Sequence, residues 1–110
     1  MSIETSNEPI IDAEEILEGI RAWVDIETPS HLGQEVNKLV DLVESQMEAL
    51  GAAIERTPGQ DDFGDILIAR TQWDHPLNTA GILVLSHLDT VHPLGTGLTT
   101  LQWRRDADHV

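Results

Sequence analysis

The sequence contains no cysteine and few basic residues. Without cysteine there is no disulfide framework, no thiolate zinc site and no cysteine nucleophile. Six lysines and arginines stand against twenty aspartates and glutamates, so the formal net charge is −14. Because phosphate groups are bound by concentrated Lys and Arg, this charge argues against nucleic acid as a partner. An anionic membrane surface would also repel the chain.

Long hydrophobic runs are missing as well. No apolar run approaches the roughly 18 residues that span a bilayer. Residues 1–9 have neither the basic start nor the apolar centre of a secretory signal, so we expect a flexible tail and a cytoplasmic protein. Apolar residues still make up 40% of the 110 residues, which suits one small domain that begins near residue 10.

Two stretches have the apolar spacing of amphipathic helices. The first begins near Asp12 and should end before Pro29, because the residue that precedes a proline avoids the helical region. The second runs from about residue 34 to residue 50, and Gly51 follows where a helix-terminating glycine belongs. The first apolar stripe consists of Ile16, Leu17, Ile20, Trp23 and Val24, and the second of Val36, Leu39, Val40, Val43, Met47 and Leu50.

Four further stretches favour β-strands, at residues 52–57, 66–69, 81–86 and 98–105. We expect loops at residues 58–62 and 73–80 and a turn at residues 106–108. Residues 82–85 are continuously apolar, which is typical of a strand buried on both faces of an α/β sheet. Two helices followed by strands predict a layered α/β fold.

His87 and Asp89 directly follow the 81–86 stretch. In extended chain, side chains two residues apart point to the same side, and strand ends in α/β sheets are where ligands gather. A neutral imidazole can bind zinc through one nitrogen while a carboxylate holds its other N–H, so Asp89 could orient His87 or bind metal itself. Spacing alone favours a structural alternative, in which Asp89 begins a turn and His87 is a half-buried side chain.

The stretch LVLSHLDTV at residues 83–91 resembles the first signature of a family of zinc-dependent amidohydrolases. The family includes glutamate carboxypeptidase, acetylornithine deacetylase and succinyl-diaminopimelate desuccinylase. Its signature is an apolar strand, then His-x-Asp, then Thr-Val or a similar pair. The two helices, IETPS at 26–30, GDILIAR at 64–70 and WRRD at 103–106 also follow the family's order. The resemblance covers about residues 10–110 and is closest to the glutamate carboxypeptidase branch.

This resemblance implies that residues 10–110 are the incomplete N-terminal part of a three-layer α/β/α zinc-exopeptidase-like catalytic domain with a mixed, mostly parallel sheet. His87 would bind one of two zinc ions, and Asp89 would orient His87 and tune its basicity. The substrate would be a small peptide or N-acyl amino acid, cleaved at an amide bond next to a carboxylate-bearing residue. The complete protein would be a candidate homodimer.

The remaining ligands of the family have no match in this sequence. They are a bridging Asp, a Glu-Glu pair that supplies the general base, a further carboxylate and a distal His. The resemblance places the bridging Asp just after Val110. Because a catalytic zinc site needs about three protein ligands, we expect the 110 residues alone to be inactive.

Two other interpretations stay open. The chain could be a non-catalytic fragment that associates with a complementary polypeptide or with itself, because exposed strand edges invite pairing. It could also be an unrelated acidic α/β binding module in which His-x-Asp is coincidental. The other histidines match no mononuclear zinc pattern, and we expect them to be solvated or part of local turns: His31, His75, His92 and His109.

Overall fold

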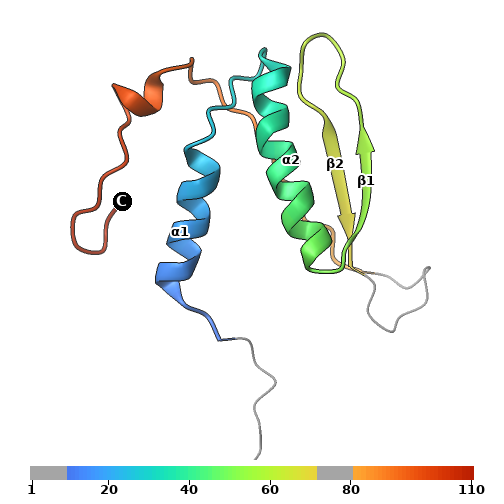
Figure 1. Cartoon of the computed structure of the whole chain (residues 1–110), viewed down its shortest axis with the longest axis horizontal. Helices are drawn as coiled ribbons and strands as arrows, with labels where there is room; N and C mark the ends of the chain where they lie inside the picture. Colours follow the sequence, from blue (N-terminus) through green and yellow to red (C-terminus); the bar gives the residue numbers. More distant parts are fainter. Residues whose placement is uncertain (1–9, 72–80) are drawn as a thin grey trace, which may run out of the picture.

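The computed structural model describes residues 10–71 and 81–110. Its elements are α1 (Ala13–Val24), α2 (Gly33–Ala49), β1 (Ala53–Thr57), β2 (Ile66–Arg70) and a short 3₁₀ helix, η1 (Thr96–Leu98). The helices run side by side in opposite directions, and the hairpin of β1 and β2 follows α2 (Figure 1). The predicted α/β class is confirmed, whereas the tail at residues 1–9 and the loop at residues 73–80 lie outside the described residues.

The core lies between α2 and the hairpin. Its buried apolar side chains all come from one stripe of α2, as the spacing predicted: Val36, Leu39, Val40 and Val43. The helix ends in a Schellman motif, in which the N–H of Ala52 donates to the carbonyl of Met47 at 3.1 Å and that of Gly51 to Glu48 at 2.9 Å. Gly51 has a φ of 84°, which a glycine adopts without steric cost.

The hairpin loop packs tightly against the first turn of α2. The N–H of Gly33 donates to the carbonyl of Asp62 at 2.8 Å. A Cβ atom on Gly33 would lie 2.5 Å from the carbonyl oxygen of Phe63, and one on Gly64 would collide with the Val36 side chain. Glycine at these two positions therefore allows the backbone of the loop to reach the helix.

Asp65 connects the hairpin loop to β1 and to α2. Its carboxylate accepts the N–H of Gly59 at 2.9 Å and Nε of Arg56 at 2.8 Å, and its own N–H donates to the side chain of Asn37 at 2.8 Å. The hydrogen bond from Gly59, followed by that from Arg56, lowers the pKa of the Asp65 carboxyl. Arg56 also reaches Asp41 of α2 at 2.7 Å, so these charges connect the hairpin to the helix.

The first helix begins and ends as the sequence predicts, but its apolar stripe is not buried. Asp12 caps α1 by accepting the N–H of Glu14 at 3.0 Å, and the helix ends at Val24, before Pro29. No residue of α1 is buried, and Ile16 and Ile20 are about half exposed. Leu17 and Trp23 are partly covered, but no element within the described part of the chain buries the stripe.

Polar contacts attach α1 to the rest of the molecule. Nε1 of Trp23 donates to Gln46 of α2 at 2.8 Å. Arg105 forms two hydrogen bonds with Glu14, at 2.7 and 2.6 Å, and Arg21 lies 5.3 Å from the centre of the Trp103 ring. The C-terminal segment therefore lies alongside α1, as Figure 1 shows.

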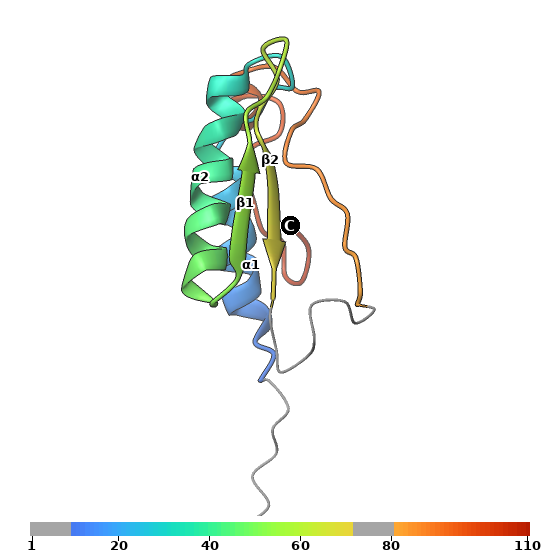
Figure 2. The ribbon, with the colours of Figure 1, turned by 90° about the vertical axis from the view of Figure 1, so that its right-hand side faces the viewer.

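The prediction of a buried strand at residues 81–86 is wrong. These residues form no strand, and Ile82 through Leu85 are each 80% to 95% exposed. Figure 2 shows α2 on one side of the hairpin and the chain after residue 81 on the other, standing apart from it. A strand needs a neighbour for its backbone hydrogen bonds, and the described residues provide none beside this segment.

The prediction of a mostly parallel sheet is also wrong for these residues. The sheet they contain has two antiparallel strands, with Ala53 opposite Arg70 and Thr57 opposite Ile66. Consecutive strands joined by a short loop pair in this way, whereas parallel strands need a crossover connection of a dozen or more residues. Parallel pairing within the described part of the chain is limited to a single bridge between Pro29 and Thr90.

Residues 98–105 do not form the predicted strand, because local hydrogen bonds bend the chain instead. Gly95, with a φ of 89°, precedes η1, and the N–H of Leu101 donates to the carbonyl of Thr96 at 2.9 Å. The predicted turn at residues 106–108 is confirmed by paired backbone bonds between Asp106 and His109. Among residues 10–71 and 81–110, no helix combines the length and apolar character that a bilayer crossing requires.

Candidate functional site

Residues 28–30, which connect the two helices, hold residues 88–90 through backbone and hydroxyl groups. The N–H of Thr90 donates to the carbonyl of Thr28 at 2.8 Å, and the N–H of Ser30 donates to the carbonyl of Thr90 at 3.0 Å. The hydroxyl of Thr28, a residue only 3% exposed, donates to the carbonyl of Leu88 at 2.7 Å. Pro29 favours an extended Thr28, which suits this strand-like pairing.

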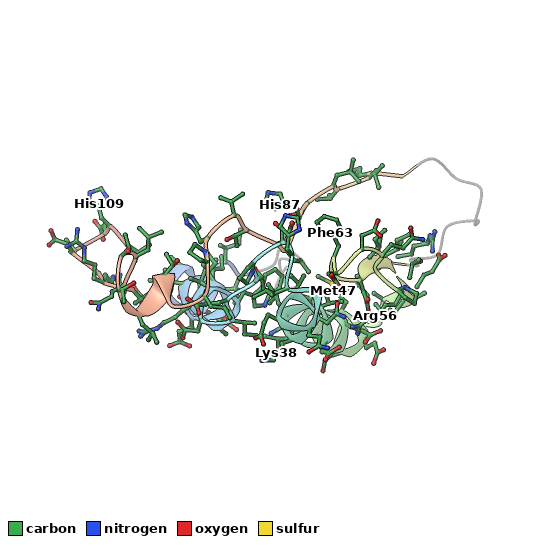
Figure 3. The ribbon with its side chains drawn as sticks, turned by 90° about the horizontal axis from the view of Figure 1, so that it is seen from above. Lys38, Met47, Arg56, Phe63, His87 and His109 are labelled. Carbon is green, nitrogen blue, oxygen red and sulfur yellow. The ribbon has the colours of Figure 1, made fainter. Side chains whose placement is uncertain are left out.

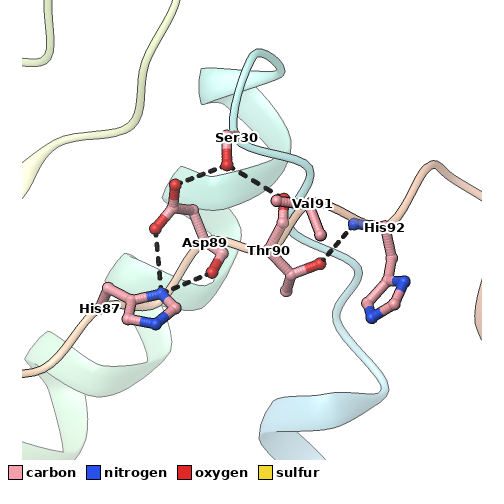
Figure 4. Close-up of a pocket in the computed structure, with 6 residues that line it drawn as sticks. All are labelled: Ser30, His87, Asp89, Thr90, Val91 and His92. Atoms are coloured by element: carbon pink, nitrogen blue, oxygen red, sulfur yellow. Dashed lines mark hydrogen bonds and ion pairs between the residues drawn. The ribbon is translucent and has the colours of Figure 1, made fainter.

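His87 and Asp89 lie together at this crossing. Nδ1 of His87 is 2.8 Å from the backbone oxygen of Asp89 and 3.3 Å from its carboxylate Oδ1. Both oxygens can only accept, so these contacts favour the neutral ring with the proton on Nδ1 and the lone pair on Nε2. The His87 side chain is 84% exposed, and Figure 4 shows Nε2 directed away from Asp89.

This arrangement bears on two expectations from the sequence. The side chains at positions 87 and 89 face each other, as their spacing predicted. The half-buried His87 of the structural alternative does not occur, because the ring stands in solvent. Whether His87 binds metal, and whether Asp89 tunes it, stay predictions.

The second carboxylate oxygen of Asp89 is also bonded. Oδ2 accepts the hydroxyl of Ser30 at 2.6 Å. This hydrogen bond, with smaller contributions that include the neighbouring His87, holds the pKa of the Asp89 carboxyl below its ordinary value. Asp89 is therefore a carboxylate at neutral pH, with one oxygen on a hydroxyl and the other beside the imidazole.

The pair opens onto a shallow pocket of about 320 Å³, lined by Ser30, His87, Asp89, Thr90, Val91 and His92 (Figure 4). The N–H of His92 donates to the hydroxyl of Thr90 at 2.9 Å, which bends the chain at the edge of the pocket. A second cavity of about 290 Å³ lies behind the same segment, between residues 86–89 and the start of β2. Residues 86–89 therefore have space on both sides.

The donor set fits one corner of a zinc site. A neutral imidazole with Nδ1 bonded and Nε2 free has the form that zinc ligands take. Within the described residues, no group of three or more His, Asp or Glu side chains is placed to hold a metal ion. Figure 3 shows His109 at one end of the molecule, well apart from His87. His75 lies outside the described residues.

Sequence reasoning assigns no role to Thr28 and Ser30. They belong to IETPS, a loop between the helices, yet both contact the His87–Asp89 segment. The available signal is Pro29, which lies between two residues with hydroxyl side chains. The proline keeps the preceding residue extended, and the hydroxyl groups are able to bond a neighbouring backbone. Nothing in the sequence indicates which segment lies beside them.

Comparisons with protein-family models, with curated proteins and with solved structures found no match to this chain. The likeness to the zinc-dependent amidohydrolases therefore stays a prediction made from the residues.

Proposed function

We propose that residues 10–110 are the N-terminal part of the catalytic domain of a zinc-dependent amidohydrolase of the glutamate carboxypeptidase type. His87 is the ligand of one of two zinc ions, and Asp89 orients it. The observation that carries the proposal is the His87 ring, whose Nδ1 is held by Asp89 while Nε2 faces solvent beside a pocket. The stretch LVLSHLDTV, which resembles the family signature, supports the same assignment.

The described residues prepare the imidazole for a cation. Asp89 favours the proton on Nδ1, which leaves the lone pair on Nε2 for a cation. The hydrogen bond from Ser30 lowers the pKa of that carboxyl and holds its Oδ2 in place. Thr28, through its bond to Leu88, holds the backbone on which both side chains stand. When bound, zinc supplies the polarisation of the scissile carbonyl and lowers the pKa of a bound water.

The remaining ligands and the general base belong, in this proposal, to polypeptide beyond the residues described. The three-layer α/β/α architecture and homodimer formation are, in this proposal, features of the complete domain. The substrate is a small peptide or N-acyl amino acid with a carboxylate next to the scissile amide.

A zinc titration of the chain, followed by NMR signals of the histidine rings, tests the assignment. We expect the ring of His87 to respond at lower zinc concentration than those of His31, His92 and His109. His87→Ala should remove that first response, and the matched variant His109→Ala should leave it unchanged. A His87 ring that responds no earlier than the other three would contradict the proposal.

One observation favours a second candidate function, self-association. The uncharged, apolar residues 82–85 are exposed and lack a strand partner within the described residues. Two copies of this segment can pair antiparallel, because apolar side chains then meet apolar side chains and no like charges are opposed.

Sedimentation velocity over a range of concentrations tests this candidate. We expect concentration-dependent dimers in the wild-type chain and a monomer in Val84→Lys. The matched variant Leu98→Lys changes a residue that is also exposed but lies outside the segment, and it should behave like the wild type. A wild-type chain that stays monomeric at every concentration would exclude this function.

A further inference from the structure

We propose that Ser30 is a positioning residue for His87, which acts through Asp89 to set which ring nitrogen is free to bind a ligand. The inference rests on the proposed function only for the identity of that ligand. The hydrogen-bond chain itself runs through residues whose contacts are all described: the Ser30 hydroxyl, the two oxygens of Asp89 and Nδ1 of His87.

The geometry gives each carboxylate oxygen of Asp89 its own partner. Oδ2 lies 2.6 Å from the hydroxyl of Ser30, and Oδ1 lies 3.3 Å from Nδ1 of His87. Rotation of the carboxylate would break the short bond to Ser30. The hydroxyl therefore fixes the plane of the carboxylate and keeps Oδ1 turned toward the imidazole.

Ser30 can impose this orientation because its own backbone is fixed. Its N–H donates to the carbonyl of Thr90 at 3.0 Å, and its hydroxyl also lies 3.0 Å from that same carbonyl. On the other side of Pro29, Thr28 is bonded to Leu88 and Thr90. The hydroxyl of Ser30 therefore belongs to a segment that is hydrogen-bonded to residues 88–90 on both sides of Pro29.

The effect on the ring follows from the hydrogen-bond roles. In water, a neutral histidine favours the proton on Nε2, which leaves that nitrogen unable to accept a cation. Beside Asp89, Nδ1 faces a backbone oxygen at 2.8 Å and a carboxylate oxygen at 3.3 Å, which favours the proton on Nδ1. The backbone oxygen of Asp89 favours the Nδ1–H tautomer without help from Ser30. The carboxylate of Asp89 adds to this preference, and Ser30 is needed for that second contribution.

NMR of the ¹⁵N-labelled imidazole, in alkaline buffer and without metal, measures the two tautomers directly. We expect His87 of the wild-type chain to carry its proton mainly on Nδ1. Ser30→Ala should lower the ratio of the Nδ1–H to the Nε2–H form roughly fivefold, the effect of losing one ordinary hydrogen bond. Ser30→Thr, which keeps a hydroxyl, should restore the wild-type ratio.

Ser86→Ala is the matched control, because Ser86 adjoins His87 and its hydroxyl makes no hydrogen bond within the described residues. It should leave the tautomer ratio unchanged. An unchanged ratio in Ser30→Ala, or an equal fall in Ser86→Ala, would overturn the proposal. If Ser30→Ala does not fold, the tautomer of His87 in the wild-type chain is the test. A wild-type ring protonated mainly on Nε2 is enough to overturn the inference.

The two proposals fail separately. A His87 ring with the Nδ1 proton but without a preferential response to zinc contradicts the metal assignment and leaves the role of Ser30 standing. A ring that responds to zinc first while its tautomer ignores Ser30→Ala contradicts only the role of Ser30.

Discussion

The hydroxyl of Thr28 donates to the backbone oxygen of Leu88 at 2.7 Å, although sixty residues separate them. Thr28 is the one polar residue that is fully buried among those described. The bond therefore joins the connection between the helices to the backbone beside His87, and the position of the candidate site depends on it.

Thr28→Val should destabilise the chain, because valine fills the same space but cannot donate a hydrogen bond. We expect a loss of about 0.5–1.5 kcal/mol in the free energy of unfolding, the effect of removing one part-buried hydrogen bond. Urea unfolding measures it. The matched variant Thr100→Val changes an exposed residue without a described hydroxyl bond and should stay within about 0.5 kcal/mol of the wild type. Equal effects of the two substitutions would show that the bond is unimportant.

Two glycine-to-alanine substitutions should have opposite effects. Gly33→Ala places a Cβ atom 2.5 Å from the carbonyl oxygen of Phe63 and should cost about 1–3 kcal/mol of stability. Gly19 lies inside α1, where an added Cβ atom would have nothing within 4 Å, so Gly19→Ala should stabilise the helix by about 0.5–1 kcal/mol. Thermal unfolding followed by circular dichroism reports both, and a stable Gly33→Ala chain would disprove the close approach of the hairpin loop.

The Asp65 carboxyl should make the stability of the fold depend on pH in the acidic range. Its pKa is lowered in the folded chain, first by Gly59 and then by Arg56, so the unfolded state binds its proton more readily. The stabilisation is therefore complete above the ordinary Asp pKa of about 3.9 and is lost as the pH falls through the lower folded value. Asp65→Asn should flatten the fall in urea midpoint below about pH 4.

Asp61→Asn is the control for this experiment, because Asp61 lies in the same loop and its side chain makes no hydrogen bond within the described residues. It should keep the wild-type dependence on pH. If Asp65→Asn loses stability in acid as steeply as Asp61→Asn does, the bonds to Gly59 and Arg56 do not stabilise the fold.

The 110-residue chain alone should not hydrolyse N-acyl amino acids or small peptides, even with added zinc. Among residues 10–71 and 81–110, His87 is the one ligand that we propose, where a catalytic zinc site needs about three and a base. A sensitive amine-release assay checks this expectation. Turnover that a chelator removes, and that His87→Ala abolishes while His109→Ala does not, would prove it wrong.

The sequence predicts secondary structure correctly where interactions between adjacent residues determine it. The stripe from Val36 to Val43 and the glycine at position 51 correctly defined α2, because helix periodicity and a left-handed terminus are properties of adjacent residues. The strands β1 and β2 were recognised for the same reason. The capping of α1 by Asp12 also needs only neighbouring residues.

Burial was predicted less well, because it depends on partners far along the chain. Val84 has the apolar neighbours of a central strand, yet it is exposed because no strand pairs with it within the described residues. In the candidate site, the proximity of His87 and Asp89 followed from their spacing. The contact between Ser30 and Asp89 did not, since a loop hydroxyl gives no sign of which distant carboxylate it meets.

The attachment of α1 by Arg105, Arg21 and Trp23 makes that helix sensitive to ionic strength. The polar contacts described above are an arginine–carboxylate ion pair, a cation over an indole ring and one hydrogen bond, and no residue of α1 is buried. At about 1 M salt the screening length falls to about 3 Å, which weakens exposed ion pairs, whereas a salt such as sulfate strengthens the apolar burial under α2. Concentrated salt should therefore release α1 while the hairpin stays packed, so that amide hydrogens in α1 exchange with solvent first.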